Sequence, residues 1–214
     1  MKIAILGTGV QGTALARLFV GGSHSVVLAS RDPEKAARLA CSLGAGAEAA
    51  PIGEAVRRAE VVALATRWEN TRDVLAQAGA FEGRVLIDAT NPETEDGRSL
   101  AVGHSTSGAE TIARWAPDAR VVKAFNHAYA ELLDRGPVFP RAVASVLYCG
   151  DDPEAKSAVA RLIGDCGFDP VDAGPLTGAR FVEPLAFLFV ELVRGLKRDP
   201  AGVALSILSR EREG

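Results

Sequence analysis

A glycine-rich turn lies between the first apolar segment of the chain, Ile3–Leu6, and the helical pattern that begins at Gln11. The turn has the sequence Gly7-Thr8-Gly9-Val10-Gln11-Gly12. Between a strand and a helix, the first glycine permits a tight turn, the second lets the backbone approach a phosphate, and the third lets the helix pack closely on the strand. Free N–H groups at a helix start also attract phosphate. The motif therefore predicts a strand–turn–helix unit that binds a dinucleotide.

Short apolar segments alternate with helical patterns along the rest of the chain. The expected strands are Ile3–Leu6, Val26–Ala29, Val61–Ala65, Val85–Ile87, Val121–Phe125 and Val143–Tyr148. Their nearly continuous apolar character is typical of a parallel sheet that is covered on both faces. Helices are expected between them, at Gln11–Val20 and after the cap-and-proline pairs Asp32-Pro33 and Asp152-Pro153. This order predicts an α/β fold with a doubly wound, mostly parallel sheet, the Rossmann NAD(P)-binding architecture.

The composition excludes several classes of partner. The 214 residues include 24 Lys and Arg against 27 Asp and Glu, so no basic surplus indicates binding to nucleic acid or an anionic membrane. No apolar run reaches the roughly 18 residues of a membrane span, and no signal peptide fits the start of the chain. The three cysteines and three histidines are scattered, so we expect reduced thiols, a cytoplasmic location and no metal site.

The residues after the second expected strand predict which dinucleotide binds. An NAD site usually has Asp or Glu about twenty residues after the glycines, where it binds the ribose hydroxyl. Here Ser30 and Arg31 hold that place, and a hydroxyl beside a guanidinium suits a 2′-phosphate. Lys35 would add charge one turn into the next helix, whereas Asp32 is better suited to cap that helix. The pattern favours NADP(H). The alternative for Arg31 is an exposed loop residue that binds only water.

Small and polar residues follow the later strands, and ligands of open α/β sheets bind outside the carboxyl ends of strands. The residues at these ends are Ala65, Thr66, Asn91 and Asn126, with Trp68, Pro92 and His127 close behind them. We expect the first four to face the nicotinamide and the last three to wall a pocket for the electron acceptor. Ordinary strand-terminal turn chemistry is the alternative at each position.

The loop Arg135–Pro140 is expected to separate two parts of the chain. Residues 1–135 would form the NADP-binding domain, and residues 141–214 a small C-terminal α/β extension of strand, helix, strand and two helices. The segment Phe181–Val193 is apolar on most sides, which indicates a helix that is largely covered. We expect the extension to cover the acceptor site, around Pro175–Arg180, and to form the contacts of a homodimer.

The chain resembles the family of NADP oxidoreductases that use the deazaflavin coenzyme F-420. The segments that carry the resemblance are residues 7–12, 30–36, 88–92, 107–110, 122–126, 150–152, 167–176 and 179–186. It implies that NADPH lies in the crevice, that a flat deazaflavin stacks on its nicotinamide, and that hydride passes directly between the two rings. Such a step requires no proton-transferring residue, so none is assigned. His127 stands where the family often has a small or hydroxylated residue, and could alter the acceptor or supply a proton; a surface histidine is the alternative.

Other activities stay open beside this one. The fold also resembles the cytosolic domain of the membrane ferric reductases, so the small-molecule acceptor could be a flavin, a quinone or chelated iron. A non-catalytic NADP(H)-binding protein is a third hypothesis, and an imine or 2-hydroxyacid reductase without its second domain is a fourth. The two tyrosines, Tyr129 and Tyr148, are not followed at four residues by Lys, so the Tyr-x-x-x-Lys pair of ketone reductases is not present.

Overall fold

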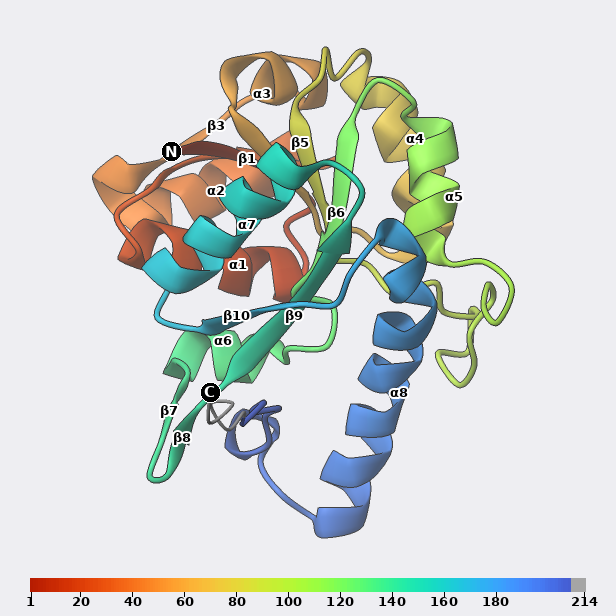
Figure 1. Cartoon of the computed structure of the whole chain (residues 1–214). Coiled ribbons are helices and arrows are strands. Elements are labelled where there is room, and N and C mark those ends of the chain that lie inside the picture. Colours follow the sequence, from red (N-terminus) through yellow and green to blue (C-terminus); the bar gives the residue numbers. More distant parts are fainter. Residues whose placement is uncertain (209–214) are drawn as a thin grey trace, which may run out of the picture.

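A sheet of eight strands forms the centre of the fold in the computed structural model, which describes residues 1–208 (Figure 1). The strands are β1 (Lys2–Leu6), β2 (Ser25–Ala29), β3 (Ala47–Ala49), β4 (Val61–Leu64), β5 (Val85–Asp88), β6 (Arg120–Ala124), β9 (Ser145–Gly150) and β10 (Asp169–Asp172). Their order is β10-β9-β6-β5-β4-β1-β2-β3, and every neighbouring pair is parallel except β6 and β9. The predicted doubly wound, mostly parallel sheet is confirmed.

Helices cover both faces of this sheet. They are α1 (Val10–Gly21), α2 (Pro33–Leu43), α3 (Ile52–Arg58), α4 (Trp68–Ala78), α5 (Gly108–Trp115), α6 (Ala130–Arg135), α7 (Pro153–Asp165) and α8 (Ala179–Leu196). One buried cluster joins α1, α2, α6 and α7 to the sheet, and a second joins α3, α4 and α5 to its other face. Because each strand is buried from both sides, the strands need the continuous apolar character seen in the sequence.

Two of the helices start as the sequence predicts. The Asp32 side chain accepts a hydrogen bond from the Lys35 amide at 2.9 Å, and Pro33 is the first residue of α2. Asp152 does the same for the Ala155 amide at 2.7 Å, at the start of α7. Asp32 therefore has the capping role that its position suggested.

The C-terminal part of the chain continues the same sheet. Its strands β9 and β10 extend the sheet beyond β6, and the hairpin β7 (Val138–Phe139) and β8 (Ala142–Val143) lies at the expected boundary. The strand expected at Val143–Tyr148 runs instead from Ser145 to Gly150.

The prediction of two helices from about Gly178 was wrong. One helix, α8, spans 18 residues and is followed in the described part of the chain by a 3₁₀ turn at Pro200–Gly202. The helix continues through Pro184, although proline breaks an internal hydrogen bond, because buried neighbours on both sides hold it: Val182, Glu183 and Ala186. From its first turns, which pack on α5, α8 runs away from the sheet (Figure 1).

Two negative findings apply to residues 1–208. No helix there is long and apolar enough to cross a membrane. No three His, Cys, Asp or Glu side chains within that range are grouped so that they could hold a metal ion.

Candidate functional site

The three glycines after β1 differ in what surrounds them. Gly7 has φ +117°, and a Cβ there would overlap the Ala65 carbonyl of the neighbouring strand end. A Cβ on Gly12 would overlap the Gly7 carbonyl, so this position brings α1 against the turn. Gly9, in contrast, has no atom within 4 Å of a built Cβ, and as the N-cap of α1 it makes no side-chain cap bond. Gly9 therefore leaves open space in front of free helix-terminal amides, which suits a pyrophosphate.

A groove of about 650 Å³ extends from this turn along the end of β2. Arg31 and Lys35 line it, are exposed, and make no ion pair with any residue in the described range. Ser30 lines it too, but its hydroxyl donates to the Asp32 carbonyl at 2.6 Å and accepts from the Asp32 amide at 3.2 Å. Two cations are thus available to an anionic group, and Ser30 shapes the loop that carries them.

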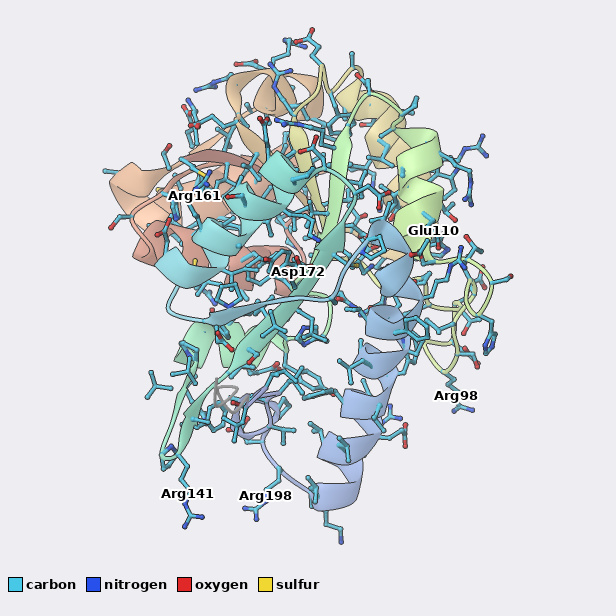
Figure 2. All side chains as sticks on the ribbon, viewed as in Figure 1. Arg98, Glu110, Arg141, Arg161, Asp172 and Arg198 are labelled. Atoms are coloured by element: carbon cyan, nitrogen blue, oxygen red, sulfur yellow. The ribbon has the colours of Figure 1, made fainter. Side chains whose placement is uncertain are left out.

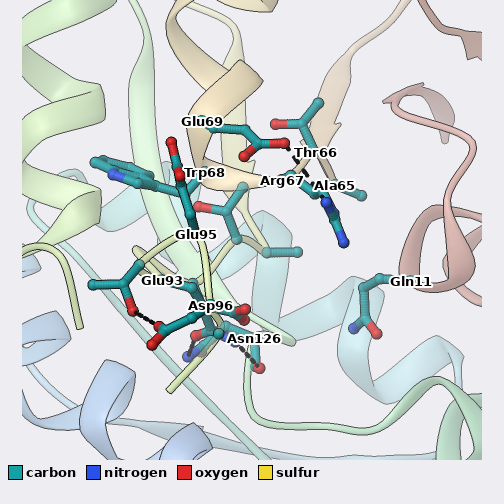
Figure 3. A pocket seen from close by; sticks show the side chains of 15 residues that line it. Gln11, Ala65, Thr66, Arg67, Trp68, Glu69, Glu93, Glu95, Asp96 and Asn126 are labelled. Atoms are coloured by element: carbon teal, nitrogen blue, oxygen red, sulfur yellow. Dashed lines mark hydrogen bonds and ion pairs between the residues drawn. The ribbon is translucent and has the colours of Figure 1, made fainter. Parts of the chain in front are cut away.

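A second cavity of about 360 Å³ adjoins the groove (Figure 3). The two share the residues Gln11, Ala65, Thr66 and Arg67. Beyond these, the cavity is lined by the ends of β4, β5 and β6 and by the loop after β5: Trp68, Glu69, Ala89, Thr90, Asn91, Glu93, Thr94, Glu95, Asp96, Gly97 and Asn126. The structure therefore brings together the predicted residues Ala65, Thr66, Asn91, Asn126 and Trp68 beside the glycine turn.

Two asparagines from different strand ends are paired at this cavity. The Asn91 side chain donates to the Asn126 carbonyl at 3.0 Å, and the Asn126 side chain donates to Asn91 Oδ1 at 3.0 Å. The Asn126 amide also donates to the Val182 carbonyl of α8 at 3.2 Å, whereas its own Oδ1 has no partner in the part of the chain described. Both amide orientations follow from these bonds, because a carbonyl oxygen can only accept.

Two residues of α1, Phe19 and Gln11, fix the turn that contains Asn126. Phe125 has φ +64°, a left-handed conformation that costs energy in a bulky residue, and it is fully buried against Phe19. The Gln11 side chain donates to the carbonyls of Phe125 and Ala128, each at 3.1 Å. Gln11 lines both cavities, but both hydrogens of its side-chain amide are bonded to this turn.

The three predicted acceptor-pocket residues have different positions. Trp68 lines the cavity and stacks on Trp115 of α5, with ring centroids 5.4 Å apart. Pro92 is buried against Gly108 and does not line the cavity.

His127 also lies outside the lining. It is 5% exposed, so the surface alternative was wrong, and its Nε2 accepts from the Leu147 amide at 3.0 Å. Burial lowers the pKa of His127 to about 4, so the ring is neutral near pH 7.

The loop after β5 supplies a wall that the sequence patterns did not reveal. Glu93, Glu95 and Asp96 lie on it and face the cavity together with Glu69, while Arg67 is the basic side chain of the lining (Figure 3). Burial raises the pKa of Glu93, which Arg67 partly opposes. The acidic run Glu93-Thr94-Glu95-Asp96, which begins five residues after the end of β5, was the available signal for this wall.

The segment Pro175–Arg180 does not line the cavity. Arg180 instead pairs through two hydrogen bonds of 2.9 and 2.6 Å with Glu110 of α5. Figure 2 labels Glu110 on this helix. Ser107, which caps α5, donates to the same carboxylate at 2.8 Å. These bonds attach the start of α8 to α5.

An open glycine turn on α1, cations after β2, and a second cavity at the next strand ends are the elements of a Rossmann-type dinucleotide-binding protein. The family described as NADP oxidoreductase, coenzyme F420-dependent, matches residues 2–92. The F420-dependent NADP reductase of Methanothermobacter marburgensis is 34% identical in an alignment of 226 positions, gaps included, that covers 97% of this chain and 99% of that protein. The chain belongs to this family of NADP oxidoreductases.

Two further comparisons extend this result. A crystal structure from Arthrobacter sp. FB24, assigned to the F420-dependent NADP reductases, has a TM-score of 0.81 and 32% identity over 92% of this chain and 95% of that one. Metalloreductase STEAP3 of Rattus norvegicus is 39% identical over 184 residues, 86% of this chain. The chain spans only 36% of the length of that metalloreductase.

Proposed function

We propose that this protein transfers hydride between NADPH and a deazaflavin of the coenzyme F420 type. The observation that carries the proposal is the junction of the two cavities at Gln11, Ala65, Thr66 and Arg67, which lets a bound nicotinamide meet a second ring. The relative from Methanothermobacter, named as an F420-dependent NADP reductase, supports this acceptor because the alignment covers nearly all of both chains.

The residues of the groove suit NADP(H). The open space at Gly9 and the free amides of α1 would hold the pyrophosphate, with Thr8, Val10 and Gln11 completing the turn. Arg31 and Lys35 would pair with the 2′-phosphate.

The strand ends suit the nicotinamide. Ala65 and Thr66 would support the ring, and the amides of Asn91 and Asn126 are hydrogen-bonding groups of the kind that its carboxamide needs. The bound rings supply the redox chemistry, so this chain has to hold the nicotinamide in place and orient it toward the acceptor. No proton donor is assigned, and His127, neutral and bonded to the β9 backbone, has no such role in this proposal.

A ferric chelate is the second candidate acceptor. A neutral or cationic chelate is favoured by the acidic wall, where Glu69, Glu93, Glu95 and Asp96 outnumber Arg67 around the cavity. Negative charge favours a neutral or cationic acceptor over a phosphorylated one, although exposure and salt weaken the effect. The likeness to a protein named as a metalloreductase points the same way.

Stopped-flow mixing separates these functions. Protein loaded with NADPH would be mixed in turn with purified deazaflavin, with riboflavin and with a ferric chelate, and NADPH absorbance followed. Hydride transfer to the deazaflavin within seconds is the expected result. Oxidation only by the chelate or the flavin would select the second candidate class, and tight NADPH binding with no oxidation would indicate a non-catalytic binding protein.

A second copy of this chain is the proposed partner of α8. The helix exposes apolar side chains at Phe181, Leu188, Leu192 and Leu196, which are 79%, 53%, 40% and 57% exposed. Their spacing of four and seven residues places them along one side of the helix. A continuous apolar strip of this kind is unusual on a monomer.

Sedimentation velocity tests the dimer. We expect a dimer at micromolar concentration that dissociates in Leu188→Glu, with Glu191→Gln on the same helix as the control. A wild-type monomer would contradict it. The cytoplasm remains the proposed location, because Cys41, Cys149 and Cys166 form no disulfide with one another, as is usual in a reducing compartment.

A further inference from the structure

A lysine is completely buried at the end of β6. Lys123 has no exposed surface, and its Nζ lies 2.8 Å from Asp88 Oδ2 on β5 and 2.9 Å from Glu183 Oε1 on α8. The same ammonium donates to the Thr90 carbonyl at 2.7 Å. One cation thus joins two strands of the sheet to α8, which lies far along the chain.

The two carboxylates are also bonded on their other sides. Glu183, 1% exposed, accepts from the Gly108 amide at 2.9 Å and the Ala109 amide at 3.0 Å, at the first turn of α5. Asp88 accepts from the Thr90 amide at 2.9 Å and from its hydroxyl at 2.7 Å. Burial would lower the pKa of Lys123, but the two carboxylates outweigh it and raise the pKa above its usual value. Lys123 therefore stays charged, and its bonds to the two carboxylates hold the cluster in one geometry.

The residues of this cluster lie next to the two asparagines that line the cavity. Thr90, whose carbonyl, amide and hydroxyl are all bonded within the cluster, is followed by Asn91. Asn126 lies three residues after Lys123 and donates to the Val182 carbonyl, one residue before Glu183. The paired amides therefore depend on where α8 sits, and α8 is held to the sheet by the contact between Glu183 and Lys123.

We propose that Lys123 and Glu183 are positioning residues, whose ion pair orients Asn91 and Asn126 toward the nicotinamide and makes α8 part of that site. The role rests on the proposed function, because it takes the nicotinamide to lie at these two amides. It goes beyond the glycine turn and Arg31, which hold the other end of the dinucleotide.

Glu183→Gln is the decisive variant. Glutamine keeps the size of the side chain and one of the two oxygens that accept from the α5 amides, and it removes the charge that holds Lys123. Glu191→Gln is the matched control, because it is the same change on the same helix at an exposed residue whose one ion pair within residues 1–208 is with Arg194. The ligands are NADPH and 2′,5′-ADP, which has the 2′-phosphate end but no nicotinamide.

We expect Glu183→Gln to bind 2′,5′-ADP as the wild type does, and to bind NADPH about tenfold more weakly, since the bonds at stake are those of two amides. The fluorescence anisotropy of bound NADPH should fall as its nicotinamide becomes less constrained. Glu191→Gln should match the wild type in all three measurements.

Two results would overturn the positioning role. One is unchanged NADPH affinity and anisotropy in Glu183→Gln, and the other is an equal loss of affinity for both ligands, which indicates a purely structural cluster. If Glu183→Gln does not fold, the double variant Lys123→Met with Glu183→Gln, which removes both charges, takes its place. A wild-type protein that binds neither ligand would instead refute the proposed function.

Discussion

The two ends of the site, the groove after β2 and the second cavity beside it, are constructed differently. The end lined by Arg31 and Lys35 consists of short contiguous segments, and its internal bonds are local, such as that between Asp32 and the Lys35 amide. At the other end, the bond between Asn91 and Asn126 joins residues 35 positions apart. The bond from Glu183 to the Gly108 amide spans 75 positions.

This difference separates two tasks of the site: holding the phosphates of the dinucleotide and orienting its nicotinamide. A phosphate needs free amides and cations, which a single turn and one exposed loop supply. Orienting a nicotinamide against an acceptor needs side chains fixed to a fraction of an ångström, which packing and several hydrogen bonds supply. Substitutions at the first end should therefore change affinity and leave the fold intact, whereas those at the second end should change affinity, orientation and stability together.

Gly9→Val should have the largest effect on the first end. The new side chain would enter the space that a pyrophosphate needs, so NADPH affinity should fall by about a thousandfold, or about 4 kcal/mol. The melting temperature should be nearly unchanged, because no atom lies within 4 Å of a Cβ at Gly9. Calorimetric titration and thermal melts measure the two. Gly21→Val, at the open end of the same helix, is the control, and a Gly9→Val protein with normal NADPH affinity would show that the turn holds no ligand.

The buried end should respond to acid. The pKa of His127 is about 4 in the folded protein and 6.5 in the unfolded chain, so unfolded protein binds the extra proton first. Stability from this residue is complete above pH 6.5 and is lost as the pH falls toward 4, by roughly 3 kcal/mol. Urea unfolding of wild type and His127→Gln at several pH values measures it. The difference between their free energies of unfolding should change over that range, and a constant difference would contradict the buried neutral imidazole.

Arg31→Ala tests the exposed end with an intermediate effect. NADPH affinity should fall by about 2 kcal/mol, because the guanidinium would form charge-assisted hydrogen bonds with the 2′-phosphate. NADH lacks that phosphate, so its affinity should hardly change. Titrations with both cofactors measure the contrast, and Arg161→Ala on α7, outside both cavities, is the control. Equal weakening of the two cofactors would refute the assignment of NADP.

Asp32→Ala should have the smallest effect. Loss of the bond to the Lys35 amide should lower the free energy of unfolding by about 1 kcal/mol, and Asp32→Ser should restore most of it. NADPH affinity should stay near the wild-type value, since the residue caps α2. A large loss of dinucleotide affinity in both variants would instead assign Asp32 to the ribose.

Much of the fold was predictable from local patterns. The strands near the start of the chain, the turn at Gly7–Gly12 and the caps at Asp32 and Asp152 each depend on residues a few positions apart. The C-terminal helix was predictable from the apolar segment Phe181–Val193, but its buried bonds through Glu183 join residues far apart in the chain and were not predictable. His127 looked like a helix-start residue, but in the tertiary structure it is buried, with β9 and Phe189 of α8 beside its ring.

The candidate site divides in the same way. The sequence by itself determined the glycine turn, the cations after β2 and the identity of the strand ends, because these rest on spacing and side-chain chemistry alone. Only the tertiary structure decided that Pro92 and His127 leave the cavity, that an acidic loop walls it, and that Lys123 joins Asp88 to Glu183. The lysine in an otherwise apolar strand was visible in the sequence, but its partners were not. The counterions of a buried charge come from segments that the fold brings together, and a local sequence pattern contains no information on which distant segments these are.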